Sequence, residues 1–363
     1  MLQQTQVKTV IPFWERWMRE LPTIEAAANA SSDKLHKLWE GLGYYTRVRN
    51  LQYAAQMIVA VHGGKFPDRF DDVLALPGIG RYTAGAICSI AYNQPTPILD
   101  GNVIRVLTRV FGIAENPKEK EINNRLWQLA AGLVASAAGD TQQEAGSRTR
   151  TRTKYEEDGC SCLNQSLMEL GALVCTPRNA QCTICPVKEL CVAFREKRVE
   201  ELPNLGQRQQ ATARRFVAFV VERNGKFLVR QRPAGVVNGH LWEFPNVEVG
   251  ARVVPTRSGI AKTGCVAPTP GDSNFSPAAD GDNPHSVVVA NAVKEVLGFA
   301  LSGVSPLVTV KHSITRYRIT LEAFKLEAGK GAFPKNGGVW KTPAQMHALA
   351  FTSAHRKVLL ALA

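Results

Sequence analysis

The sequence predicts a mainly helical N-terminal region followed by a separate α+β domain. Through residues 1–94, and again up to about residue 134, apolar residues recur at helical spacing. Residues 196–213 are charged and polar without apolar periodicity, which predicts an interdomain linker. Beyond the linker, runs of strand-forming residues flank Asn224-Gly225, the pair most suited to a tight β-hairpin. These observations separate a helical part from a part that contains a sheet.

Within residues 1–94 we expect helices joined by short connections, with most of the periodic apolar residues in the core. The three clearest sets are Val7, Val10, Ile11 and Trp14; Leu35, Leu38, Trp39 and Leu42; and Leu51, Ala54, Ala55, Ile58 and Val61. Gly63-Gly64 ends the third helix. Helical spacing continues from about 103 to 134 and resumes from Leu163 to Val174.

A glycine-rich turn stands between two of these helices, at Leu76-Pro77-Gly78-Ile79-Gly80. Pro77 restricts the backbone, whereas Gly78 and Gly80 permit conformations and close approaches that a side chain would block. The next helix begins near Arg81, and its first N–H groups and dipole favour a bound anion such as a phosphate. An ordinary helix–helix turn is the alternative.

Two segments read as loop insertions. Residues 138–161 break the helical pattern with polar and alternating basic residues, and residues 251–286 are rich in Pro, Gly, Ser and Asp. The basic residues of the first insertion either contact a phosphate backbone or belong to a solvated loop. Strands are expected at 216–221, at 226–231 and around Tyr317–Leu321, which gives the C-terminal part its α+β character.

The composition limits the choice of partner. The 363 residues suffice for two or three domains, and the formal charge of +13 suits a polyanion such as nucleic acid, although acidic proteins and membranes stay open. There is no run of eighteen apolar residues, and polar Gln3–Gln6 follow closely after Met1 and Leu2. We therefore expect an intracellular protein without membrane association, in the cytoplasm and nucleoid of a bacterium or the nucleus of a eukaryote.

Four of the eight cysteines are clustered, namely Cys175, Cys182, Cys185 and Cys191, and they are separated by six, two and five residues. Clustering in an intracellular protein predicts a metal site rather than a disulfide framework. Four thiolates can bind a zinc ion or an iron–sulfur cluster, and the number of cysteines alone does not distinguish the two.

The turn at Leu76–Thr83, followed by Ile98-Leu99-Asp100-Gly101-Asn102-Val103, resembles the helix-hairpin-helix and catalytic-aspartate segment of base-excision DNA glycosylases. The opening Met1–Val7 and Gly41-Leu42-Gly43-Tyr44-Tyr45 are similar to motifs of the adenine DNA glycosylase (MutY) family. Tyr82 stands where bifunctional relatives carry a Schiff-base lysine. The resemblance extends to the C-terminal part, where Arg232-Pro233 and Leu241–Pro245 look like the Nudix-like domain of that family.

The resemblance implies a mainly α helix-hairpin-helix glycosylase region with an iron–sulfur loop, followed by an α+β Nudix-like domain. The expected boundaries are 1–94 for the helix-hairpin-helix domain without its N-terminal helix, 95–195 for the cluster domain with the inserted loop 138–161, 196–213 for the linker, and 214–363 for the lesion-recognition domain with the inserted loop 251–286. The four clustered cysteines are then the ligands of a 4Fe-4S cluster.

Three residues carry catalysis by this resemblance. The Asp100 carboxylate faces the positive charge that develops on the sugar, while Asn102 and Tyr82 complete the polar shell around it. A helix N-cap is the alternative role of Asp100, and the two roles are compatible. A tyrosine at position 82 cannot form a Schiff base, which predicts a monofunctional enzyme without strand cleavage.

The resemblance also implies DNA contacts. Gln4 and Tyr44 match side chains that wedge into the duplex, and Gly78, Gly80 and Arg81 match the phosphate-binding hairpin. An exposed helix residue and a core aromatic are the alternative readings of Gln4 and Tyr44.

Two further positions concern recognition of the bases. Glu169 matches a carboxylate that reads adenine, or it is an ordinary exposed helix residue. Ser313 and Thr315 lie in the segment matching the loop that senses 8-oxoguanine, where the family usually has Phe-Ser-His in place of Ile314-Thr315-Arg316.

The implied function is excision of adenine mispaired with 8-oxoguanine or guanine in double-stranded DNA, by a monomer. The general-acid glutamate of the family matches a position upstream of Met1, so we expect residues 1–363 to excise adenine slowly. The alternative is a catalytically inactive, lesion-binding DNA module. Residues 292–298 faintly resemble a Nudix helix but lack its paired glutamates, which disfavours a Nudix pyrophosphatase.

Overall fold

The computed structural model describes residues 1–143, 158–207, 210–249, 293, 296–297, 304–314, 316–327 and 337–362, with 140–143 described by their backbone alone. The predicted insertion 251–286 lies wholly outside these ranges. None of the helices in the described part of the chain is long and apolar enough to span a membrane.

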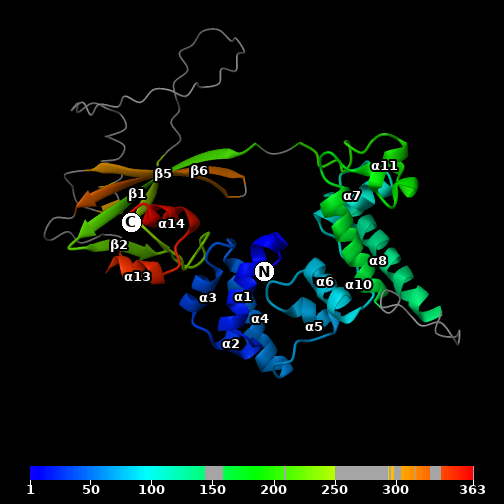
Figure 1. The fold of residues 1–363 in the computed structure, drawn as a ribbon, viewed down its shortest axis with the longest axis horizontal. Helices are drawn as coiled ribbons and strands as arrows, with labels where there is room; N and C mark the ends of the chain where they lie inside the picture. Colours follow the sequence, from blue (N-terminus) through cyan, green and yellow to red (C-terminus); the bar gives the residue numbers. More distant parts are fainter. Residues whose placement is uncertain are drawn as a thin grey trace, which may run out of the picture. The chain divides into compact units, whose positions relative to one another are not determined.

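The N-terminal part is helical, as expected (Figure 1). Its longer helices are α1 (Val7–Glu20), α2 (Ile24–Asn29), α3 (Ser32–Trp39), α4 (Thr46–His62), α5 (Phe70–Ala75), α6 (Arg81–Tyr92), α7 (Gly101–Val110), α8 (Lys120–Gln143) and α10 (Gly159–Glu169). Short helical turns follow at η2 (Leu170–Val174), η3 (Cys182–Ile184), η4 (Lys188–Leu190) and α11 (Val192–Arg195).

Local chemistry explains several helix ends. Thr23 and Ser31 cap α2 and α3 by accepting hydrogen bonds from the backbone N–H groups of Ala26 and Lys34, at 3.1 and 3.3 Å. After α4, Gly63 and Gly64 take positive φ values of 60° and 79°, which confirms the predicted stop.

Two expectations about the helices need correction. Val7, Ile11 and Trp14 of α1 are 62%, 49% and 52% exposed, and the buried face carries Val10 and Trp17 instead. Because apolar residues occupy more than one face of α1, their spacing does not reveal which face packs inward. The predicted insertion 138–161 is also narrower, since α8 continues to Gln143 and α10 begins at Gly159.

The C-terminal part contains one mixed sheet of seven strands among the described residues. The strands are β1 (Thr212–Arg223), β2 (Lys226–Gln231), β3 (Trp242–Glu243), β4 (Asn246–Val249), β5 (Ser305–Ile314), β6 (Tyr317–Glu327) and β7 (Val339–Lys341). Their order is β3-β2-β1-β6-β5, β4 pairs with β1, and β7 pairs with β2. Only β1 and β6 run parallel among these paired strands. Asn224 and Gly225, with φ values of 51° and 70°, form the predicted β1–β2 hairpin turn.

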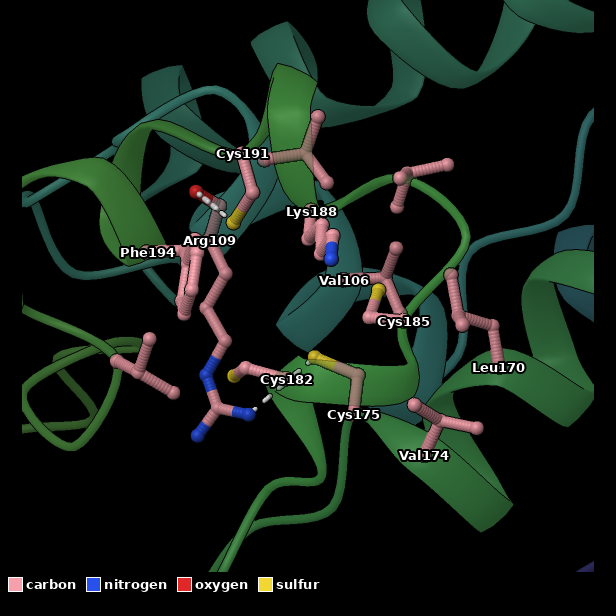
Figure 2. A pocket seen from close by; sticks show the side chains of 13 residues that line it. Val106, Arg109, Leu170, Val174, Cys175, Cys182, Cys185, Lys188, Cys191 and Phe194 are labelled. Carbon is pink, nitrogen blue, oxygen red and sulfur yellow. Dashed lines mark hydrogen bonds between the residues drawn. The ribbon is translucent and has the colours of Figure 1, made fainter.

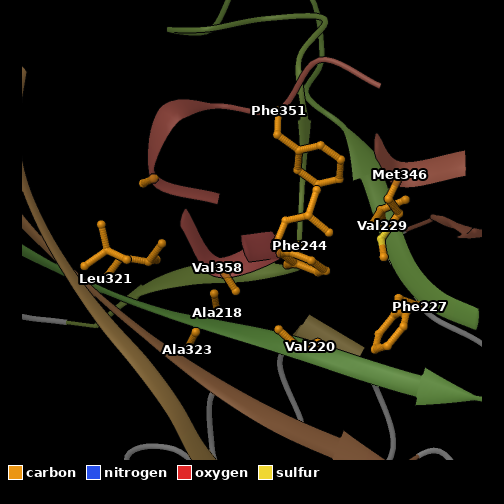
Figure 3. Close-up of a cluster of buried hydrophobic side chains, with 13 residues drawn as sticks. Ala218, Val220, Phe227, Val229, Phe244, Leu321, Ala323, Met346, Phe351 and Val358 are labelled. Atoms are coloured by element: carbon orange, nitrogen blue, oxygen red, sulfur yellow. The ribbon is translucent and has the colours of Figure 1, made fainter. Parts of the chain in front are cut away.

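Successive side chains of β1 point to opposite faces of the sheet and pack into two different hydrophobic cores. Ala218 and Val220 face a cluster that includes residues of α13 (Pro343–Ala348) and α14 (Ser353–Leu360), as Figure 3 shows. Val217, Phe219 and Val221 face the opposite cluster. The sheet is therefore buried on both faces at this strand, which explains its continuous apolar run.

Contacts divide the chain into two compact units. The sheet unit, as we call it, comprises Met1–Trp14, Ser31–Thr46 and Gln209–Ala363, and the helical unit comprises Glu15–Ala30 and Arg47–Arg208. Residues 31–46 thus pack with the C-terminal part although they lie early in the chain. The predicted domain boundaries follow chain order and stay a prediction.

Candidate functional site

The turn between α5 and α6 contains two glycines, and the backbone conformation requires glycine at only one of them, Gly78. Gly78 has a φ of +80°, and a Cβ there would lie 2.6 Å from the Cβ of Asn50. Gly80 is the N-cap of α6 with an ordinary φ of −100°, and a Cβ there would meet open space. Arg81 is exposed and stacks its guanidinium 4.0 Å from the centre of the Trp127 ring.

Asp100 is the N-cap of α7, as its alternative role predicts. Its Oδ1 accepts hydrogen bonds from the backbone N–H groups of Asn102 and Val103, at 2.9 and 2.8 Å. Its Oδ2 has only a long contact of 3.4 Å from the Asn102 Nδ2 among the bonds described. Oδ1 therefore holds the side chain in place. Oδ2 makes only this weak hydrogen bond among those described, so a ligand could readily replace it.

Tyr82 lies within electrostatic reach of this carboxylate. Its half-buried ring packs on the cluster that contains Leu99 and Val103, and its hydroxyl donates to the Met168 sulfur at 3.6 Å. Burial raises the pKa of Tyr82, and the Asp100 charge raises it further. The phenol therefore stays protonated at neutral pH and remains a hydrogen-bond donor beside Asp100.

A buried arginine connects Asn102 to the cysteine loop. Arg105 donates from Nη2 to the Asn102 Oδ1 at 2.8 Å and to the Gly171 carbonyl at 2.6 Å. Its Nε donates to the Cys175 carbonyl at 2.7 Å. Burial lowers the pKa of Arg105, but an arginine side chain stays charged in proteins. A Cβ at Gly171 would lie 2.6 Å from the Cβ of Asn102, so close packing joins the same two segments.

Arg109, one helical turn later, is buried against the cysteines themselves. Its Nε donates to the Leu202 carbonyl at 2.8 Å, and its Nη1 donates to the Thr176 carbonyl at 2.8 Å. The same Nη1 lies 3.3 Å from the Cys175 Sγ. A guanidinium in this place stabilises a thiolate, the form in which cysteine binds metals.

The structure brings the four predicted ligands, Cys175, Cys182, Cys185 and Cys191, to one pocket (Figure 2). Burial raises the pKa of the Cys182 thiol, and the other three cysteines of the set raise it further, which places all four within electrostatic reach. The remaining lining is mostly apolar. No group of three or more His, Cys, Asp or Glu side chains in the described ranges is placed to hold a single metal ion.

This pocket suits a cluster bound by thiolates. All four cysteines are free thiols, and Arg109 supplies positive charge beside one of them. Four cysteine thiolates in a largely apolar pocket are the usual donor set for a 4Fe-4S cluster. A bound cluster would supply rigid cross-links between the segments that carry its ligands.

The two predicted wedge residues belong to the sheet unit. Gln4 and Tyr44 are both exposed, Tyr44 by 52%, and both have left-handed backbones, with φ values of 56° and 48°. Non-glycine residues adopt this conformation infrequently, and when they do they are often at functional sites. The core alternative for Tyr44 is therefore wrong, whereas the neighbouring Tyr45 is buried.

The remaining predicted residues, which concern recognition of the bases, lie at exposed positions or outside the described residues. Glu169 is exposed at the end of α10, next to Met168. Ser313 is exposed on β5, at the edge of the sheet and opposite Arg318. Thr315 lies outside the described residues.

Sequence reasoning missed Arg105 and Arg109. Both are more than 90% buried, although arginine usually lies at the surface. A signal for them was present in the sequence, because the two arginines stand four residues apart in a mostly apolar segment directly after Asp100.

Matches to two protein families define the class to which this chain belongs. Residues 1–131 match the family described as "HhH-GPD superfamily base excision DNA repair protein", and residues 216–361 match the NUDIX domain. Both matches confirm the predicted fold class.

Individual relatives narrow the class. The adenine DNA glycosylase of Rattus norvegicus is 37% identical over 292 residues, which cover 68% of this chain and 52% of that protein. The adenine DNA glycosylase of Schizosaccharomyces pombe is 33% identical, covering 70% of this chain and 60% of that protein. That of Buchnera aphidicola subsp. Schizaphis graminum is 33% identical, covering 70% and 67%. The chain belongs to the adenine DNA glycosylase family, and it spans about half the length of the rat relative.

Proposed function

We propose that this chain excises adenine mispaired with 8-oxoguanine or guanine in DNA, by hydrolysing the N-glycosidic bond without cleaving the strand. The observation that carries the proposal is the Asp100 carboxylate, with Oδ1 bound to two backbone N–H groups and Oδ2 in weak contact. The names of the relatives and the basic charge of the chain point to the same substrate class.

The geometry suits the chemistry of base removal. Loss of the base leaves positive charge on the sugar, and a fixed carboxylate lowers the energy of that state. Asp100 needs little reorganisation for this role because α7 already holds it. The Tyr82 hydroxyl orients the sugar or its phosphate as a neutral donor, and without an amine at this position no Schiff base forms.

In this proposal the remaining residues bind DNA and the cofactor. The four cysteines hold a 4Fe-4S cluster, and the turn at Gly78-Gly80-Arg81 binds a phosphate at the start of α6. Gln4 and Tyr44 enter the duplex, Glu169 reads adenine, and Ser313 with Thr315 contacts the opposite base. Their exposure supports these roles for Gln4, Tyr44, Glu169 and Ser313.

The test uses the purified chain and a duplex with one adenine opposite 8-oxoguanine. Binding is measured by fluorescence anisotropy and excision by alkaline cleavage of the abasic product. Asp100→Asn keeps a capping oxygen, so the fold should persist while excision falls at least about a hundredfold. Asp158→Asn is the matched control, because Asp158 is also a helix N-cap but makes no side-chain capping bond.

The outcomes separate the two candidate functions. Abasic product that depends on Asp100 supports the glycosylase. Tight binding to the lesion duplex with no product from the parent chain would instead identify a lesion-binding module.

A further inference from the structure

A buried carboxylate lies where α3 meets the C-terminal part of the sheet unit. Glu40 directly follows α3 and is only 8% exposed. A charged side chain this deeply buried is costly unless partners surround it. Its partners therefore indicate what the position does.

Those partners come from both ends of the chain. The Glu40 Oε1 accepts a hydrogen bond from the backbone N–H of Phe351 at 3.1 Å. Its Oε2 accepts one from the Lys37 Nζ at 2.8 Å, and the same Nζ donates to the Leu349 carbonyl at 3.1 Å. The Arg356 Nη1 stands 3.8 Å from Oε2. We call Lys37, Glu40, Leu349, Phe351 and Arg356 the Glu40 latch.

The C-terminal side of the latch is built into the core of the sheet unit. The Phe351 side chain is fully buried in the core between the sheet and the last two helices (Figure 3). Its neighbours are tied to β3, because Trp242 donates to the Ala350 carbonyl and Thr352 donates to the Trp242 carbonyl. Glu40 thus binds the amide of Phe351, the residue between the two that pair with Trp242 of β3.

The other side of the latch is the loop that presents Tyr44. A Cβ at Gly41 would lie 3.9 Å from the Arg356 Nη1, and Gly41 has a φ of +111°. The buried Trp39 closes the loop by donating from Nε1 to the Gly43 carbonyl at 3.1 Å. Tyr45 is 3% exposed, and its ring lies 6.0 Å from that of His36.

Electrostatics place Tyr45 beside the latch as well. Burial raises the pKa of Tyr45 to about 12, and the charges of Glu40 and Arg356 also act on its hydroxyl. Tyr45 is therefore the buried anchor of the loop, while the next residue toward the N-terminus, Tyr44, is held outward in a left-handed conformation.

We propose that Glu40 is a positioning residue that locks the lesion-recognition part of the chain to the loop carrying Tyr44. These contacts fix the position of the Tyr44 loop relative to the C-terminal part. Both can then bind one duplex without first having to be brought into the right relative orientation. This role rests on the proposed function, in which Tyr44 and the C-terminal part both bind the lesion pair.

The first test measures the latch without DNA. In the full chain, Glu40→Ala should speed hydrogen exchange of the Phe351 amide at least about tenfold, because that amide loses its acceptor. The Thr352 amide, bonded to Trp242, is an internal reference that should not change. Glu40→Met, which keeps the length of the side chain but offers no oxygen acceptor, serves if the alanine variant fails to fold. Unchanged exchange at Phe351, or equal acceleration at both amides, would overturn the latch.

The second test measures its effect on DNA. Glu40→Gln should weaken binding to the lesion duplex about tenfold and binding to a matched A:T duplex much less. In a Tyr44→Ala background the same substitution should have little further effect, because the loop no longer presents the ring. Glu201→Gln is the matched control, since Glu201 pairs with Arg198 at an exposed site.

The results also distinguish this inference from the proposed function. Additive losses in the double variant would overturn the positioning role. A parent chain that binds lesion and matched duplexes equally would overturn the role of the latch in DNA binding, whereas the proposed function is decided by abasic product that depends on Asp100. The exchange experiment decides whether the latch itself exists.

Discussion

Arg105 and Asn102 are joined side chain to side chain, with the Arg105 Nη2 donating to the Asn102 Oδ1 at 2.8 Å. Asn102 in turn donates its backbone N–H to Asp100, and Arg105 donates to the Cys175 carbonyl. The candidate catalytic carboxylate and the first cysteine of the loop are thus connected by an unbroken series of hydrogen bonds. Arg105 is the link between the two ends of this series.

Arg105→Lys should destabilise the protein by about 2–4 kcal/mol, because one ammonium group cannot reproduce the fork geometry with which the guanidinium binds three acceptors on two segments. We expect iron content to fall together with the urea midpoint. Arg198→Lys is the control, since Arg198 forms ion pairs with the exposed carboxylates of Glu196 and Glu201. Equal effects of the two substitutions would contradict a structural role for the Arg105 contacts.

Cys185→Ser should remove the brown colour, the bound iron and most of the folded protein, because serine is a poor ligand for iron–sulfur clusters. Cys162→Ser is the matched control, since Cys162 lies on α10 and does not line the pocket. Iron is measured by elemental analysis after anaerobic purification. Stoichiometric zinc without iron in the parent protein would refute the cluster.

Gly80→Asp should weaken binding to all duplexes alike, because it places a negative charge where we propose a phosphate. Gly80→Ala should bind nearly as well as the parent, since its Cβ meets open space. The two variants separate charge from size. The measurement is duplex affinity over a range of salt concentrations, and a loss limited to one mispair would show that the turn does not bind the backbone.

Gly78→Ala should instead destabilise the fold by about 1 kcal/mol or more, because Gly78 has a positive φ and lies against Asn50. The expected change is a lower urea midpoint in the absence of DNA. An unchanged midpoint would mean that the turn relaxes to accommodate the methyl group.

The C-terminal part should lose stability in mild acid through His355. Burial lowers the pKa of His355 from 6.5 to about 4, and its Nδ1 accepts a hydrogen bond from the Phe244 N–H, which protonation would abolish. Stability is therefore complete above pH 6.5 and declines as the pH falls toward 4, because the unfolded chain binds the proton first.

At pH 5 the loss should be about 2 kcal/mol relative to pH 7.5. His355→Asn, which offers an amide oxygen that does not titrate, should reduce this dependence. The measurement is the urea midpoint of both proteins between these pH values. Parallel curves would exclude His355 as the source.

Much of the site is local and could be read from the sequence. Asp100 caps α7 through N–H groups two and three residues away, and Gly78 is required by its own φ value. The Asn224-Gly225 turn and the cysteine spacing are equally local. Chain connectivity alone brings such groups together, so the sequence by itself determined the helical part, the sheet-containing part, the capped aspartate and the grouping of four thiols.

The tertiary structure decided which surfaces are buried and what lies against them. Arg105 and Arg109 meet acceptors 66 to 93 residues away, and Glu40 meets Phe351 across 311 residues. The exposed face of α1 likewise depends on what packs beside that helix. The spacing of apolar residues predicts that a helix has an apolar face. The free energy of burying that face depends on partners that only the folded chain brings into contact.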